Sequence, residues 1–87
     1  MLKLTYTERF QKHYVKLSGE EKRQFRKKLA VFADNPLHPS LRTKRIKGTD
    51  GLFEFSVNMD IRVIWFYEND ALAALIDIGH HDILKNF

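Results

Sequence analysis

The chain has 87 residues, 44% of them hydrophobic and none of them cysteine, which leaves room for one domain over residues 1–87 and excludes a disulfide framework or a thiolate zinc site. The formal net charge is +4, but residues 1–48 carry 13 Lys and Arg against 4 Asp and Glu, whereas residues 49–87 carry 2 against 7. Folded into one small domain, the cations of the first half form a face that favours a polyanion, either nucleic acid or an acidic protein segment.

The first two predicted elements are a short strand and a helix. Residues 2–6 alternate apolar and polar side chains, which is typical of a half-buried strand. Thr7 is a residue type that caps helices, and Phe10, Tyr14 and Leu17 follow it at the spacing of one apolar stripe. The pattern therefore predicts a helix that starts after Thr7 and ends just beyond this stripe.

A second helix is predicted to start at Ser18. Ser18 and Glu21 have the spacing of a capping box, in which the serine hydroxyl accepts a hydrogen bond from the third backbone N–H and the glutamate reaches back. The helix ends at Asn35, because the residue before Pro36 disfavours the helical conformation. Its buried stripe consists of Phe25, Leu29, Phe32 and Ala33. Its cations face mostly away, and an ordinary solvated helix face explains them as well as an anion-binding surface does: Lys22, Arg23, Arg26, Lys27 and Lys28.

Four consecutive strands are predicted after the helices. Residues 38–41 are expected to be an extended loop that leads into them. The strands cover residues 42–47, 52–57, 61–67 and 71–78. The first is basic, as edge strands often are, and the last two are almost continuously apolar, which predicts central strands covered on both faces. The fold class is therefore α+β, with an N-terminal strand, two antiparallel helices and a four-strand antiparallel meander in one sheet.

The candidate chemistry lies at the end of the last strand, where Gly79 is followed by His80, His81 and Asp82. Metal binding is disfavoured, because adjacent histidines on an extended chain point to opposite faces and no further ligand motif completes a site. Imidazole titrates near neutral pH, so either histidine could be a general acid or base in phosphodiester cleavage. The alternative is a structural histidine.

Cations near these histidines strengthen the catalytic alternative. Arg62 on the adjacent strand could stabilise the charge of a phosphorane-like transition state, although an ordinary solvent-facing strand residue is its alternative. The basic strand supplies side chains that could hold the flanking phosphates: Arg42, Lys44, Arg45 and Lys47.

The chain resembles the RelE/ParE superfamily of bacterial and archaeal toxins in its order of elements and in three segments, HPSLRTKRIKG, DIRVIWFYEND and LIDIGHHDIL. The resemblance covers essentially the whole chain and is closest to the YafQ-like branch. It implies a RelE-like β-α-α-β-β-β-β fold and the toxin component of a type II toxin–antitoxin system. Toxins of this kind are ribosome-dependent endoribonucleases that cut messenger RNA and so inhibit translation.

The resemblance also implies site residues. Ser56 stands where the YafQ-like branch has a histidine, and Leu84 stands where it has an aromatic residue. The positions that match are His38, Asp60 and His80 for the YafQ-like branch, as acid/base groups, and Arg62 and His81 for the RelE branch.

No metal or other cofactor is expected for such a toxin, because the ribose 2′-hydroxyl supplies the nucleophile. The implied partners are a cognate acidic antitoxin, messenger RNA and the ribosomal A site. Two alternatives stay open: a ParE-like inhibitor of DNA gyrase without nuclease chemistry, and a degenerate member that only binds an antitoxin. A cytoplasmic location without membrane contact is expected, since residues 1–6 lack a signal-type apolar region and no window approaches the roughly 20 apolar residues of a membrane span.

Overall fold

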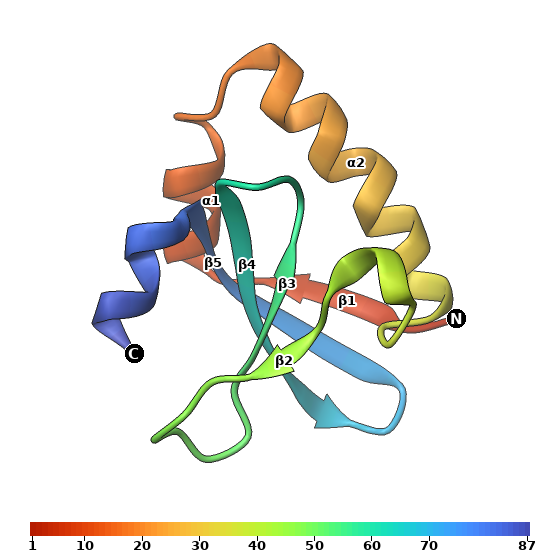
Figure 1. The fold of residues 1–87 in the computed structure, drawn as a ribbon. Coiled ribbons are helices and arrows are strands. Elements are labelled where there is room, and N and C mark those ends of the chain that lie inside the picture. Colours follow the sequence, from red (N-terminus) through yellow and green to blue (C-terminus); the bar gives the residue numbers. More distant parts are fainter.

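The structure, a computed structural model, describes residues 1–87 apart from the side chain of Asn86. Its elements follow the predicted order of one strand, two helices and four strands, with two 3-10 helices in addition (Figure 1). In chain order they are β1 (Lys3–Tyr6), α1 (Glu8–Tyr14), α2 (Gly19–Asp34), η1 (Pro39–Leu41), β2 (Lys44–Arg45), β3 (Phe53–Ser56), β4 (Ile61–Asn69), β5 (Leu72–His80) and η2 (His81–Asn86).

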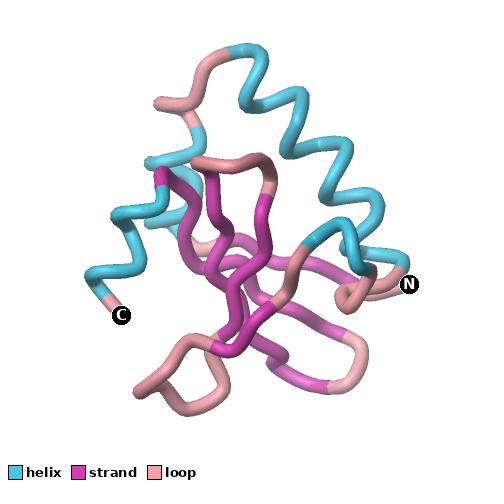
Figure 2. Tube along the Cα trace, in the orientation of Figure 1, coloured by secondary structure: helices cyan, strands magenta, loops and turns pink.

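All five strands belong to one sheet, with the order β1-β5-β4-β3-β2 (Figure 2). Strands β2 to β5 form the predicted antiparallel meander, which confirms the α+β class. β1 joins the other edge by pairing parallel with the first half of β5, from Lys3 opposite Leu72 to Tyr6 opposite Leu75. β4 is therefore the central strand, and β1 and β2 are the two edges.

Both helices begin where their capping residues predict. Thr7 Oγ1 accepts a hydrogen bond of 3.1 Å from a backbone N–H in the first turn of α1. Ser18 and Glu21 form the capping box, with Ser18 Oγ 3.1 Å from the Glu21 nitrogen and Glu21 Oε1 2.8 Å from the Ser18 nitrogen. α1 is shorter than predicted: it ends at Tyr14, and Leu17 is buried from the connection to α2 instead.

Aromatic side chains fill the space between the helices and the sheet. Phe32 of α2 packs on Phe55 of β3 and Trp65 of β4, with ring centroids 4.8 and 4.7 Å apart, and all three are fully buried. Phe10 of α1 and Phe25 of α2 extend the cluster, with centroids 5.7 Å apart. Because full burial of one such side chain stabilises a fold by about 1.5–3 kcal/mol, the cluster fixes α2 over one face of the sheet and anchors α1 to the same core through Phe10.

The opposite face of the sheet is also covered near the end of β5. The apolar runs of the central strands predicted that both faces would be covered. Ile64 of β4 and Asp77 of β5 are paired in register, and both are fully buried. η2 folds back onto this face, where a Cβ on Gly79 would lie 2.6 Å from Ile83 Cγ2. Glycine at this position therefore lets β5 and η2 approach each other closely.

β1 ends at Tyr6, and α1 continues along the edge of the sheet beside the second half of β5. Thr7 Oγ1 donates a 2.8 Å hydrogen bond to the carbonyl oxygen of Ile76, which fixes the start of the helix against the strand. A β-bulge lies at the same place, because Trp65 pairs with Leu75 and the preceding residue of β4 pairs with Asp77. Ile76 is thus an extra residue in β5.

No described helix is long and apolar enough to cross a membrane.

The prediction of an extended loop at residues 38–41 is wrong. Pro39–Leu41 forms η1, whose first position suits the fixed φ of Pro39. The His38 side chain caps the turn by accepting a hydrogen bond of 3.1 Å from the backbone N–H of Ser40. A proline and a local side-chain acceptor therefore favour a tight turn over an extended chain.

The predicted basic strand over residues 42–47 is reduced to Lys44–Arg45. Arg42 adopts the left-handed conformation with φ 51° at the end of η1, which interrupts an extended chain. The last strand differs in the other direction. β5 continues through His80, beyond its predicted end at residue 78, because the ladder with β4 persists to Ile61.

Candidate functional site

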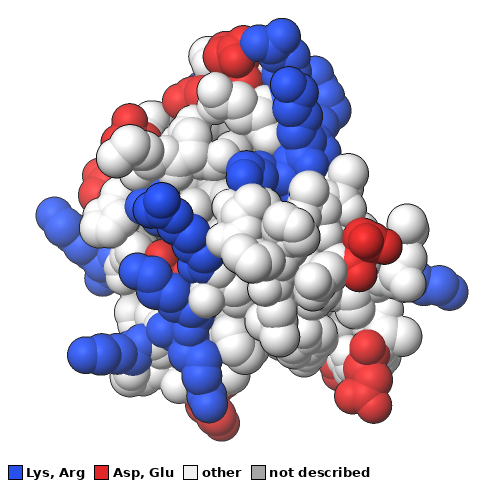
Figure 3. Space-filling view, turned by 45° about the vertical axis from the view of Figure 1, so that its right-hand side comes forward, with Lys and Arg blue, Asp and Glu red and all other residues white. Residues whose placement is uncertain are grey.

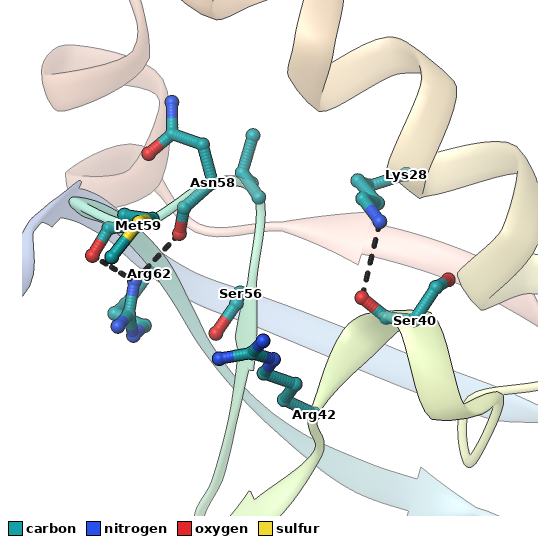
Figure 4. Close-up of a pocket in the computed structure, with 8 residues that line it drawn as sticks. Lys28, Ser40, Arg42, Ser56, Asn58, Met59 and Arg62 are labelled. Carbon is teal, nitrogen blue, oxygen red and sulfur yellow. Dashed lines mark hydrogen bonds between the residues drawn. The ribbon is translucent and has the colours of Figure 1, made fainter.

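A cationic cleft lies where α2, η1 and the turn between β3 and β4 meet. Its volume is about 240 Å³, and it receives Lys28 from α2, Arg42 from the end of η1 and Arg62 from β4 (Figure 4). The other lining residues are Ser40, Ser56, Val57, Asn58 and Met59. Positive charges that converge on a concave surface favour an anion such as a phosphate.

Arg62 is held in place by the turn that precedes its strand. Its Nη1 donates to the carbonyl oxygens of Asn58 at 2.8 Å and Met59 at 3.0 Å, and its Nε lies 3.7 Å from Oε1 of Glu54. The side chain is 16% exposed. The solvent-facing alternative for Arg62 is therefore wrong, and its guanidinium is a fixed part of the cleft wall.

Asn58 organises this turn. Its side-chain oxygen accepts hydrogen bonds from the backbone N–H groups of Asp60 at 2.8 Å and Ile61 at 2.7 Å. Its side-chain nitrogen donates to Oε1 of Gln24 on α2 at 2.6 Å, and its backbone carbonyl accepts from Arg62. One asparagine thus connects α2, the turn and the arginine, so the cleft wall is preorganised.

The backbone directs Arg42 into the cleft. Its φ of 51° and ψ of 43° lie in the left-handed region, which costs a non-glycine residue roughly 1–2 kcal/mol. The side chain projects toward Ser56 (Figure 4). Across the cleft, Nζ of Lys28 donates a 3.1 Å hydrogen bond to the carbonyl oxygen of Ser40, which ties α2 to η1. Both cations are therefore positioned by local geometry.

His38 lies next to the cationic cleft without lining it. Its side chain is exposed, and Nδ1 is 3.1 Å from the backbone nitrogen and 2.9 Å from Oγ of Ser40. Because the backbone N–H of Ser40 can only donate, Nδ1 accepts, and the proton of the neutral ring is on Nε2. In this arrangement His38 presents a hydrogen-bond donor, Nε2–H, to its surroundings.

His80 lies in a second cleft of about 200 Å³ at the end of β5, here called the histidine cleft. Its side chain is 64% exposed, and Nε2 is 3.5 Å from Oε2 of Glu21 on α2. Gly79, which also lines the histidine cleft, pairs with Arg62 in the sheet. The structure thus brings His80 and Arg62 to the same end of β4 and β5, although they line different clefts.

The remaining predicted site residues are exposed and line neither cleft. Asp60 directly precedes β4 and His81 directly follows β5, so both lie at the end of the sheet that carries the clefts. The others lie in or near β2: Lys44, Arg45 and Lys47. On one face of the molecule, Lys and Arg gather along α2 and over β2 (Figure 3). This distribution favours long-range attraction of a polyanion.

Comparison with known proteins shows a likeness in fold. No protein-family model matches the sequence, and comparison with curated proteins found no match. YafQ from E. coli strain BL21(DE3) has a TM-score of 0.75 at 19% identity, covering 97% of this chain and 98% of that one. A chain of the intact E. coli RelBE toxin–antitoxin complex has a TM-score of 0.74 at 18% identity, covering 92% and 96%. The YoeB/ParE toxin from Agrobacterium tumefaciens has a TM-score of 0.78 at 13% identity, covering 92% and 99%.

This chain has the fold of the RelE/ParE toxins. Of the residues that line the cationic cleft, only Arg42 and Arg62 were predicted as site residues; the polar residues that were missed include Lys28, Ser40 and Asn58. A signal exists for Lys28, which is three residues after Phe25 and four before Phe32, the spacing that places it beside the buried stripe. The other two reach the cleft through a turn and a 3-10 helix, whose geometry the sequence pattern did not indicate.

A metal site needs several His, Cys, Asp or Glu side chains close together. Among the residues of this RelE fold that the structure describes, no three or more His, Cys, Asp or Glu are grouped so that they could hold a metal ion. Cleavage without a metal stays a prediction, based on the 2′-hydroxyl as the nucleophile.

Proposed function

We propose that this chain is the toxin of a type II toxin–antitoxin pair and that it cleaves messenger RNA on the ribosome. The cationic cleft carries the proposal. On a fold that YafQ and a RelBE chain share, cations from α2, η1 and β4 surround one space, and His80 lines a separate cleft at the same end of β4 and β5. Phosphodiester cleavage needs both features, a cationic phosphate site and a group that transfers protons.

The proposed reaction is the in-line attack of a ribose 2′-hydroxyl on the adjacent phosphorus. A base takes the proton of the hydroxyl, the bond between phosphorus and the 5′-oxygen breaks, and an acid protonates that oxygen. His80 is one of these two groups, and His38, Asp60 and His81 are candidates for its counterpart or for orienting it. Arg62 stabilises the charge that develops on the phosphate oxygens.

The other cations hold the flanking phosphates. Arg42 and Lys28 lie in the cationic cleft with Arg62, and β2 continues the positive surface at the edge of the sheet. Contacts of this kind position a strand without distinguishing its bases. The proposed β2 contacts come from Lys44, Arg45 and Lys47.

Primer extension on messenger RNA from cells that express the chain tests this proposal. We expect cuts in phase with codons in a translated message and none in a copy of the same message whose start codon is removed. Arg62→Gln, which removes the charge from the cleft wall, should abolish the cuts. Intact messages in growth-arrested cells would contradict the nuclease assignment.

A second function is favoured by the match to the YoeB/ParE toxin. A ParE-like toxin would inhibit DNA gyrase without cleaving RNA, and His80 and Asp60 would then be structural. The same cells distinguish the two functions, because gyrase inhibition produces DNA damage without codon-phased cuts. A degenerate antitoxin-binding chain would produce neither.

The proposed partner is a small acidic antitoxin. The E. coli RelBE complex is a solved structure of a toxin with its antitoxin. In this chain the balance of 13 cations to 4 anions over residues 1–48 offers a surface for an acidic segment. A partner that binds only the folded state would also stabilise this small domain.

A further inference from the structure

Among the described residues, Asp77 of β5 is the one charged side chain that is fully buried. The extra residue Ile76 shifts the alternation of side chains, so that Ile78 enters the core and Asp77 points to the opposite face. A buried carboxylate is costly unless charged or hydrogen-bonding groups surround it. The groups around Asp77 should therefore explain why it is there.

Two residues of α1 meet this carboxylate, one helical turn apart. Nδ1 of His13 lies 2.5 Å from Oδ1 of Asp77, and Nε of Arg9 lies 3.0 Å from Oδ2. Oδ1 also accepts the backbone N–H of Ile78 at 2.8 Å. Arg9 is close without hydrogen-bond alignment, so its contact with Oδ2 is a charge interaction. The hydrogen bond to His13 is thus the directed contact that α1 makes with Asp77.

This hydrogen bond fixes the chemistry of the His13 ring. A carboxylate accepts, so Nδ1 of His13 donates, and Nε2 of the neutral ring is left as the nitrogen that can take a proton. The His13 side chain is 36% exposed, whereas Asp77 is fully buried. A buried carboxylate that orients a partly exposed imidazole also stabilises the imidazolium formed when that ring accepts a proton.

His13 and His80 line the same cleft from different elements. The histidine cleft is bounded by α1 on one side and by the end of β5 and η2 on the other. The charged or titratable groups around His13 are Arg9 on α1, Lys16 in the connection that follows α1, Asp77 and His80 on β5, and Asp82 in η2. Two imidazoles and a lysine ammonium thus face one space. This space lies next to Gly79, the residue of β5 that pairs with Arg62.

We propose that His13 is the general base and His80 the general acid of the RNA cleavage, an assignment that rests on the proposed function. The 2′-hydroxyl gives its proton to Nε2 of His13, and the 2′-oxygen bonds to phosphorus as the bond to the 5′-oxygen breaks. The 5′-oxygen takes a proton from the His80 imidazolium, so the products are a 2′,3′-cyclic phosphate and a 5′-hydroxyl. His80, 64% exposed, regains its proton from solvent, and His13, 36% exposed, releases its proton to solvent. Asp77 is a positioning residue.

If the contact between His13 and Asp77 only held α1 against β5, as a structural clamp, a change at His13 would affect stability and not proton transfer. Arg9 provides the matched control. Arg9 pairs with the same carboxylate but does not line the histidine cleft. Arg9→Gln and His13→Gln should therefore both weaken the clamp and lower the melting temperature. Only His13→Gln should remove a group that transfers a proton.

The test is the pH dependence of ribosome-dependent messenger RNA cleavage by the purified protein. We expect His13→Gln to lower the rate by about 10²- to 10⁴-fold and to flatten the limb of the profile that rises with pH. Arg9→Gln should keep both limbs and most of the rate. Asp77→Asn, which conserves volume, should lower the rate and distort the same limb as His13→Gln. A His13→Gln profile that matches Arg9→Gln would overturn the assignment.

A binding measurement on the wild-type protein keeps the inference separate from the proposed function. NMR signals of the His13 and His80 rings are followed while an RNA oligonucleotide with a 2′-deoxy residue at the cleavage position is added. Shifts of both rings would show that the two histidines face one bound RNA even if the wild type cuts no message; that outcome would refute the nuclease proposal and the proton-transfer roles but leave the shared RNA site. Saturable binding of this oligonucleotide that leaves the His13 ring unshifted would overturn the role of His13.

Discussion

Oε2 of Glu21 lies 3.5 Å from Nε2 of His80, while Oε1 of the same carboxylate accepts the backbone N–H of Ser18 at 2.8 Å. The residue that completes the capping box of α2 therefore also faces the proposed general acid. A change at the start of α2 reaches the histidine cleft through one side chain, so the proposed cleavage would be coupled to the stability of the helix start.

The first prediction concerns the pH dependence of stability. The hydrogen bond from the Ser18 backbone is the main cause of a lowered pKa of Glu21, and the nearby His80 adds to it. Because the folded pKa lies below the unfolded value of roughly 4.3, the carboxylate stabilises the fold above that pH and loses its effect as the pH falls through the folded pKa. Melting temperatures between about pH 6 and 3 should therefore fall more steeply for the wild type than for Glu21→Gln. Parallel curves would show that Glu21 is not linked to folding.

The second prediction concerns His80. His80→Ala should stay folded and lose growth inhibition, since loss of a proton-transfer group costs about 10²- to 10⁴-fold in rate and an exposed strand-end side chain contributes little to stability. Growth of expressing cells and cleavage of messenger RNA are the measurements. The same change at His81, which lines neither cleft, tests which of the two adjacent imidazoles acts. If the His80→Ala variant still arrests growth and cleaves messenger RNA at the wild-type level, His80 is not a catalytic residue.

The third prediction concerns the salt dependence of RNA binding. Arg42→Gln should reduce the slope of log affinity against log salt by roughly 0.7, the value for one phosphate contact with a single strand. Lys3→Gln is the matched control, because Lys3 is an exposed cation on the opposite edge of the sheet. Titrations at four or more salt concentrations give the slopes. Equal slopes for the two variants would mean that Arg42 does not contact RNA.

The fourth prediction concerns the contact between β5 and η2. A methyl group on Gly79 would lie 2.6 Å from Ile83 Cγ2, so Gly79→Ala should destabilise the fold by about 1–3 kcal/mol through overpacking. The double variant Gly79→Ala with Ile83→Ala should recover part of this loss, because the clashing atoms are gone. Urea unfolding of the two single variants and the double variant measures the coupling. Additive losses would show that η2 does not pack against Gly79.

The fifth prediction concerns the partner. A neighbouring gene should encode a small acidic protein that copurifies with the untagged chain and raises its melting temperature. A partner present at 100 times its Kd stabilises the folded state by about 2.7 kcal/mol. The rise should shrink at high salt if the cationic half of the chain provides the contact. High expression without toxicity, and without capture of such a protein, would contradict the toxin proposal.

Features set by neighbouring residues were predicted from the sequence. The capping box of Ser18 and Glu21 spans four residues, and the apolar runs of β4 and β5 are continuous, so local patterns were sufficient. The β1 pairing was not predicted, since nothing in residues 2–6 specifies a parallel partner. The η1 turn was missed because the pattern around Pro39 also fits an extended chain.

The site could be predicted only in part, because its contacts join distant segments. Arg62 and Arg42 were predicted, and both line the cationic cleft. His13 and Asp77 were not predicted, because they lie 64 residues apart in the sequence and no local pattern relates them. Strict alternation from the core residue Leu75 would place Asp77 in the core. The bulge at Ile76 reverses this, and a bulge of one residue leaves no mark in an apolar run.

The pairing of β1 with β5 has a consequence for the time at which the proposed site is assembled. Tyr6 precedes the end of β5 at His80 by most of the chain, an interval of roughly 4–15 seconds at synthesis rates of about 5–20 residues per second. Until β5 has emerged, β1 has no partner strand, and α1 cannot bring His13 to Asp77. Under the proposed function, a nascent chain would therefore be inert toward the ribosome that makes it, and cleavage would begin only after the last strand has been released.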